Sequence, residues 1–153
     1  MEGRVVRLTR GADYGLRGLL YLAKQPPGQV CLVGQVAEAE GIPQSYLAKI
    51  FQDLSRSGLM VSHRGAKGGF SLARSADSIN LRQVIEAIQG PIAFAACLDP
   101  RQGCPRQDTC GLYRILAQAQ ATLLRTLEST TLQQLAEAEQ QFQATHPRTP
   151  LRS

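Results

Sequence analysis

Two apolar stripes of helical period, separated by a very short turn, most constrain how this chain can fold. The first stripe spans residues 32–40 and consists of Leu32, Val33, Val36 and Ala37. Gly41 can adopt the left-handed conformation that ends a helix, and Pro43 suits the first turn of the next one. The second stripe runs down to Gly58 and consists of Tyr46, Leu47, Ile50, Phe51 and Leu54. Two helices joined by so short a glycine-containing turn are predicted to form a helix–turn–helix.

Further elements flank this pair. Residues 13–24 carry apolar side chains at helical spacing and end at a Pro-Pro-Gly turn, so they are predicted to form a first helix. Residues 59–61 and 70–72 are predicted as short strands around a glycine-rich turn. A fourth helix should begin after Asn80 as N-cap, end at Gly90 and bury Leu81, Val84, Ile85 and Ile88. The predicted fold is mostly α, with a winged helix–turn–helix domain and a small β-hairpin wing.

The C-terminal half begins with a loop at 92–110, the cysteine loop, which is rich in Pro, Gly and Asp. A long helical stripe follows that no remaining element can cover, so we expect it to pair with a second chain; it consists of Leu112, Leu116, Ala119, Leu123 and Leu127. Thr131 and Gln134 resemble a capping box for a last helix that ends near Phe142. The predicted units are a winged helix–turn–helix domain (1–90), a cysteine-rich cluster-binding loop (91–111), dimerisation helices (112–143) and a flexible tail (144–153).

The net charge of +5 lies wholly in the first half of the chain. Residues 1–75 hold ten Lys and Arg against five Asp and Glu, whereas residues 76–153 hold seven of each. This excess suits contacts with phosphate groups, although an ordinary basic surface would also show it. No segment approaches the roughly 18 apolar residues of a membrane span, and the N-terminus lacks the apolar stretch and cleavage site of a secretion signal. We therefore expect a cytoplasmic protein without a membrane partner.

The predicted second helix of the motif carries polar residues where such helices contact bases in the major groove. Gln44 can contact adenine through two hydrogen bonds, Ser45 suits several bases, and Lys49 can reach guanine or a phosphate. Tyr46 is predicted to be a core or phosphate contact. In the wing, Arg64 beside a glycine is suited to a minor groove, with Lys67 near the backbone. The alternative is that these side chains are merely solvated.

Three of the four cysteines, Cys97, Cys104 and Cys110, lie within fourteen residues. Thiolates are ligands of iron–sulfur clusters and zinc, and three in one loop can face one centre. Asp108 and Thr109 are predicted to cap the long helix, which would put Cys110 at the positive end of its dipole. Incidental loop thiols, or one disulfide pair plus a free thiol, are the alternative. Cys31, in an apolar run, is expected to be a small core residue.

Residues 8–24, residues 43–72 and the triple-cysteine loop together resemble the Rrf2 family of winged-helix transcriptional regulators. The most specific part of the resemblance is the wing, with Arg64, Gly65, Gly68 and Gly69. The match covers about residues 7–140. It implies a homodimer whose long C-terminal helices cross, bound to a near-palindromic site on double-stranded DNA. It also implies an iron–sulfur cluster on the three cysteines, of a two-iron or four-iron type.

The resemblance leaves the fourth ligand of such a cluster open. Cluster-biogenesis regulators of the family have a His three residues after the last cysteine, where this chain has Tyr113. Nitric-oxide sensors of the family use an Asp from the first helix of the partner subunit, and Asp13 falls at that place. Asp13 is equally suited to cap the first helix.

We therefore expect a dimeric transcriptional repressor whose affinity for its operator is set by a cluster that senses nitric oxide, redox state or cluster supply. A thiol switch without metal, or control by a partner protein, is the alternative for the same fold. A small electron-transfer protein is a third possibility, but it would not need a glycine wing bearing Arg64. Nothing resembles a catalytic triad, a phosphate-cradling loop or a paired acid and base, so no enzyme is predicted.

Overall fold

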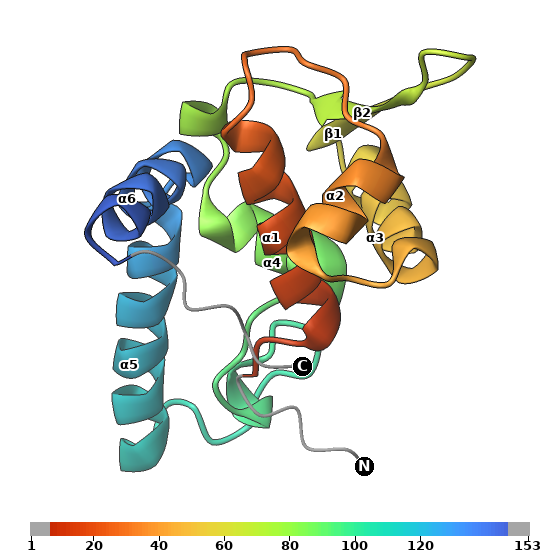
Figure 1. The fold of residues 1–153 in the computed structure, drawn as a ribbon. Coiled ribbons are helices and arrows are strands. Elements are labelled where there is room, and N and C mark those ends of the chain that lie inside the picture. The colour runs from red at the N-terminus through yellow and green to blue at the C-terminus, as the bar shows by residue number, and fades with distance from the viewer. Residues whose placement is uncertain (1–6, 147–153) are drawn as a thin grey trace.

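Six α-helices and one β-hairpin form residues 7–146, the part of the chain that the computed structural model describes (Figure 1). The mostly α, winged helix–turn–helix prediction is confirmed. The elements are α1 (Arg10–Ala23), α2 (Val33–Glu40), α3 (Gln44–Arg56), β1 (Met60–His63), β2 (Gly69–Leu72), α4 (Leu81–Gln89), α5 (Gly111–Glu128) and α6 (Leu132–Thr145), with short 3₁₀ turns η1 (Ala76–Ser78) and η2 (Ala96–Leu98).

The helix–turn–helix consists of α2 and α3. Gly41 has φ 65°, the left-handed conformation expected for the end of α2. Pro43 occupies the N-cap of α3 and not its first turn, one residue earlier than predicted. Val36 of α2 and Leu47 of α3 are fully buried in the common core. The two helices are therefore held as one rigid unit.

The hairpin is fastened to this unit at its base. Its strands pair antiparallel from Met60 with Leu72 to His63 with Gly69. Phe70 meets Phe51 of α3 edge to face, with ring centroids 5.2 Å apart. Cys31 exchanges two backbone hydrogen bonds of 2.8 Å with Phe70 and is buried, as expected for a small core residue. Only the tip of the hairpin projects from the body (Figure 1).

Helix α1 runs through the centre of the molecule and begins earlier than predicted. Its N-cap is Thr9, whose side chain accepts a 3.1 Å hydrogen bond from the amide of Ala12. The capping role considered for Asp13 is thus wrong. The extra turn is held from outside the helix, because the side chain of Gln89 on α4 accepts from the Thr9 amide and donates to the Arg7 carbonyl, both at 3.0 Å.

The caps predicted for α4 and α6 are confirmed. Asn80 with Gln83, and Thr131 with Gln134, form reciprocal capping boxes. Along α4, Val84 and Ile85 are buried, whereas Leu81 and Ile88 are only half-buried. Helix α6 extends three residues beyond Phe142, to Thr145. It therefore includes the first two residues of the predicted tail, and residues 147–153 lie outside the described part of the chain.

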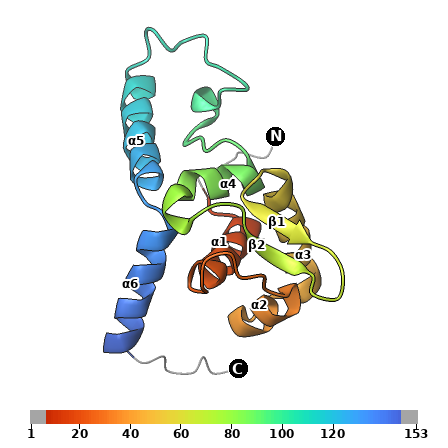
Figure 2. The ribbon, with the colours of Figure 1, turned by 90° about the horizontal axis from the view of Figure 1, so that it is seen from above.

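Helices α5 and α6 flank the molecule on one side (Figure 2). Leu132 and Ala136 of α6 are buried, and this helix packs against α1 and η1. Helix α5 buries no residue, and its Leu112 and Ile115 are 66% and 63% exposed. Of its apolar stripe, Leu112 and Ala119 are exposed, whereas Leu116, Leu123 and Leu127 are half-buried, so the stripe is only partly covered in the single chain. None of the helices in residues 7–146 combines the length and apolarity that crossing a membrane requires.

Candidate nucleic-acid interface and cysteine loop

The outward face of α3 near its N-terminus is polar. Gln44, Ser45, Tyr46 and Lys49 are all exposed, while Leu47 beneath them is fully buried. Helical spacing produces this division, because the buried positions of α3 repeat on one side only. The structure thus brings the four residues predicted on α3 onto one accessible face.

Tyr46 differs from its neighbours because it also packs within the protein. Its ring meets that of Tyr14 on α1 edge to face, with centroids 5.6 Å apart. The Arg17 guanidinium lies 5.7 Å from the centroid of the Tyr14 ring. Tyr46 is 40% exposed. It therefore joins the start of α3 to α1 and still presents an edge to solvent.

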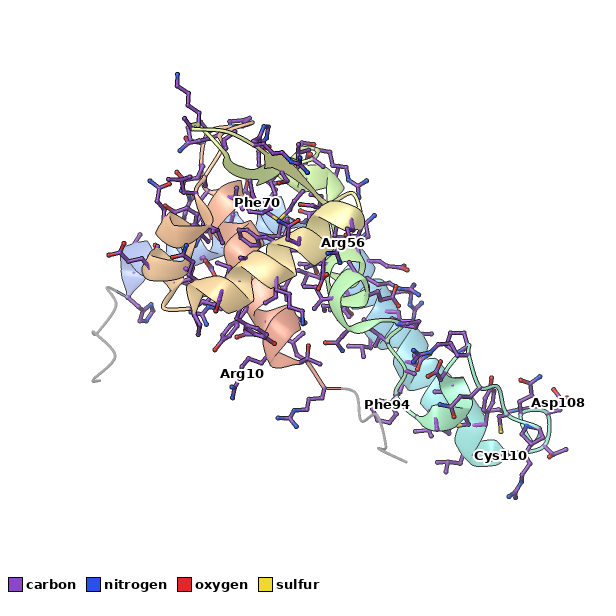
Figure 3. All side chains as sticks on the ribbon, turned by 90° about the vertical axis from the view of Figure 1, so that its right-hand side faces the viewer. Arg10, Arg56, Phe70, Phe94, Asp108 and Cys110 are labelled. Carbon is purple, nitrogen blue, oxygen red and sulfur yellow. The ribbon has the colours of Figure 1, made fainter. Side chains whose placement is uncertain are left out.

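The hairpin places Arg64 and Lys67 at its tip, where both are exposed. Gly65 and Gly69 have φ 101° and 145°, so the predicted use of positive φ in this turn holds for these two glycines. His63 pairs with Ser71 through Nε2 and Oγ, 2.8 Å apart. Figure 3 looks onto the side of the molecule where α3 and the hairpin lie together.

A groove of about 450 Å³ lies between the start of α2, α3 and the hairpin, and sequence patterns did not indicate it. Its walls include Leu32, Gly34, Gln44, Gln52, Ser62 and His63. The groove exists because residues far apart in sequence meet there. Two of its polar lining residues, Gln44 and Gln52, belong to α3, the helix that also carries the exposed polar face.

The basic residues of the first half fall into two groups. Arg17 pairs with Glu40 at 3.5 Å and Asp13 at 3.8 Å, and Lys24 pairs with Glu139. Lys49, Arg64 and Lys67, by contrast, form no salt bridge within residues 7–146 and are exposed. These three charges are therefore available to phosphate groups.

The three clustered cysteines lie at the other end of the molecule. Figure 3 shows Cys110 and Asp108 far from Phe70 of the hairpin. Cys97 lies in η2, and all three thiols are half-exposed. The N-cap of α5 is Cys110 itself, whose Sγ accepts a 3.4 Å hydrogen bond from the amide of Tyr113. The caps predicted at Asp108 and Thr109 are therefore wrong, although Cys110 does lie at the helix start.

These thiols are not assembled into a metal site in the single chain. Cys97, Cys104 and Cys110 are free, and within residues 7–146 no three His, Cys, Asp or Glu side chains gather as metal ligands would. Asp13 lies on α1, half-exposed and paired with Arg17. Soft thiolate donors suit an iron–sulfur cluster, but this conformation does not bring them together. Cluster binding would require the cysteine loop to rearrange.

The start of the cysteine loop is tied to two helices. The Ile92 amide donates to Oε1 of Glu86 on α4 at 3.2 Å, and the Phe94 amide donates to Oε1 of Gln120 on α5 at 2.7 Å. The other oxygen of Glu86 accepts from Arg82 Nε at 3.2 Å. Arg82 also pairs with Glu128 at the end of α5, and this hydrogen bond raises the pKa of Arg82.

A family model described as "Rrf2: Iron-dependent Transcriptional regulator" matches residues 8–138. CymR, the global cysteine regulator of B. subtilis, is 26% identical with a TM-score of 0.69, over 88% of this chain and 98% of that one. Staphylococcus aureus CymR is 29% identical with a TM-score of 0.64, over 84% and 97%. IscR of T. potens is 22% identical with a TM-score of 0.70, over 94% and 93%, which is a likeness of fold.

Proposed function

Because this chain belongs to the Rrf2 family, and is therefore a transcriptional regulator and not an enzyme, we propose that it represses transcription as a homodimer on a two-fold operator. Helix α3 would enter the major groove with Gln44, Ser45 and Lys49 toward the bases, and Tyr46 toward the backbone. Arg64 would enter the adjacent minor groove and Lys67 would contact phosphate. The observation that carries this proposal is the joint exposure of these residues on α3 and the hairpin.

Dimerisation is supported by α5. This helix of 18 residues buries none of its side chains in the single chain and carries an apolar stripe along its length. Apolar surface of that extent is stabilised when a second copy covers it. Two copies would set two α3 helices about one DNA turn, roughly 34 Å, apart, as a palindromic operator requires.

The cysteine loop would be the sensing element. We propose that Cys97, Cys104 and Cys110, with Asp13 of the partner subunit, hold an iron–sulfur cluster in the dimer. When bound, such a cluster would supply a centre that nitric oxide or oxygen modifies, or that is lost when cluster supply falls. The proposal is supported by three half-exposed free thiols within one loop.

The contacts of α4 support a route from this loop to the DNA. Glu86 holds the loop at Ile92. Two residues further along α4, Ile88 packs against α1, where a Cβ added at Gly11 would lie 3.4 Å from Ile88 Cγ2. The same turn of α1 meets Tyr46 of α3 through Tyr14. Rearrangement of the loop would therefore shift α4, α1 and the start of α3 in turn.

A thiol switch without metal is the second candidate. It is favoured by the fact that the three thiols are free and do not gather as metal ligands within the described residues. Oxidation of a pair of them would also reorganise the loop and act through the same contacts of Glu86. Only the chemistry at the thiols differs between the two candidates.

Anaerobic isolation followed by mass spectrometry under non-denaturing conditions separates these candidates. A cluster predicts a dimer carrying iron and acid-labile sulfide, both lost when Cys97, Cys104 and Cys110 are replaced by Ala. A thiol switch predicts iron-free protein whose operator affinity changes on oxidation. Cys31→Ala is the matched control, since this buried cysteine lies outside the loop. If neither loss of the cluster nor oxidation of the thiols changes operator affinity, the sensing proposal fails, while the proposal that the protein binds DNA is unaffected.

A further inference from the structure

Gly34 is the second residue of α2, and nothing in its backbone requires glycine. It is absent from the glycines with positive φ within the described residues. Glycine disfavours a helix because its backbone loses more freedom on folding than that of any other residue. A short helix of eight residues would gain from any other small residue at this position. The glycine therefore calls for another explanation.

The nearest side chain to Gly34 is that of Gln44. A Cβ added at Gly34 would lie 3.3 Å from Oε1 of Gln44 and 3.5 Å from both its Cδ and its Nε2. The three amide atoms are thus almost equidistant, so the amide group lies flat over the space that a side chain would occupy. Both residues line the groove between α2, α3 and the hairpin.

We propose that Gly34 is a specificity determinant that acts through Gln44. The missing side chain lets the Gln44 amide rest against α2 at the groove wall, in the orientation from which its oxygen and nitrogen address adenine. This inference rests on the proposed function, in which Gln44 contacts a base. Reading adenine through two hydrogen bonds requires both amide atoms to be placed together.

The effect of a side chain at residue 34 would fall on base recognition and not on folding. The group that must move is the end of a flexible side chain, and the groove beside it is open. Alanine also favours the helix. Gly34→Ala should consequently fold at least as stably as the original protein while displacing the Gln44 amide by a few tenths of an ångström or more.

A double-mutant cycle tests this inference with Gly34→Ala, Gln44→Ala and the combined variant. The melting temperature of each variant is measured. Its affinity is measured for an operator chosen by the original protein from random duplexes, and for versions of that operator in which each adenine is replaced in turn. Gly34→Ala should lower discrimination at the adenine that Gln44→Ala identifies by about five-fold or more. It should have no further effect when Gln44 is already Ala.

Ala39→Ser is the matched control, because Ala39 is exposed on the same helix α2 but does not line the groove, so one added atom there should leave base discrimination unchanged. The inference is overturned if Gly34→Ala leaves discrimination unchanged, or weakens binding equally with and without Gln44. If Gln44→Ala itself changes no base preference, the proposed role of Gln44 fails along with it. Absence of sequence-selective binding by the original protein would refute the DNA-binding proposal, so the two failures are distinguishable.

Discussion

Single side chains on α3 and the hairpin should differ in what they contribute to DNA binding. Gln44→Ala is expected to change base preference by about 1–3 kcal/mol, because it removes hydrogen bonds to one base edge. Lys67→Ala should weaken binding to all sequences alike and reduce the slope of log affinity against log salt by about 1. Titrating operator and random duplexes at several salt concentrations measures both. If Gln44→Ala lowers the affinity for the operator and for the random duplex equally, Gln44 does not contact a base.

The four cysteines should also differ in reactivity. Cys31 is 3% exposed, and burial raises the pKa of its thiol. Less of it is therefore thiolate at neutral pH, and the thiolate is the reactive form. In reduced, iron-free protein we expect a colorimetric thiol reagent to modify three cysteines quickly and the fourth only after urea is added. Fast reaction of all four in the folded protein would contradict the buried position of Cys31.

Helix caps formed by residue types with strong local preferences could be predicted from the sequence, whereas caps formed by other residue types could not. Asn80 and Thr131 cap helices as predicted, because their partners lie three residues away in sequence. The start of α1 was predicted three residues too late, although Thr9 is a local cap of the same kind that accepts from Ala12. The support that Gln89, 80 residues further along, gives to this turn could not be predicted from local sequence. Cys110 was missed as a cap because cysteine is not among the usual capping residues.

At the scale of elements, α4 is expected to connect the cysteine loop with α3, the helix proposed to enter the major groove. Glu86→Ala removes the acceptor of the Ile92 amide and a partner of Arg82. We expect operator binding to persist while its dependence on the state of the cysteine loop is largely lost. The measurement is the ratio of operator affinities between untreated and oxidised or cluster-depleted protein.

Glu137→Ala is the matched control, because this carboxylate lies exposed on α6 and accepts only from the neighbouring Gln133 among the described residues. The connection through α4 is refuted if Glu86→Ala keeps the full ratio of affinities. A loss of operator binding in every state would indicate instead that Glu86 supports the fold, and thermal melting would reveal it.

The elements themselves were largely predictable, whereas their contacts were not. Helical spacing and the turn at Gly41 gave the helix–turn–helix, because both act within a few residues. The burial of Leu132 depends on where α6 meets α1 and η1, and the groove beside Gln44 depends on how three elements meet. The periodicity of apolar residues along the sequence does not indicate which elements pack against one another. Whether the cysteine loop closes around a cluster stays a prediction for the same reason.

At the scale of the whole molecule, the partly uncovered face of α5 should decide the oligomeric state. Leu112→Glu combined with Ile115→Glu places two charges on a surface that is exposed in the single chain, so intrachain packing is unaffected. In a dimer the same charges would be buried without partners, at a high cost. We expect a folded monomer in sedimentation measurements at micromolar concentration, and an operator affinity lower by about 100-fold because two half-sites are no longer bound together.

The control is Gln29→Glu, because Gln29 is exposed between α1 and α2, outside the predicted dimerisation helices. It should leave both the oligomeric state and the affinity unchanged, which would show that a new surface charge is not sufficient to dissociate the protein. A double variant that still sediments as the original protein does would rule out α5 as the dimer interface. Full operator affinity in a demonstrated monomer would instead rule out the need for two linked α3 helices.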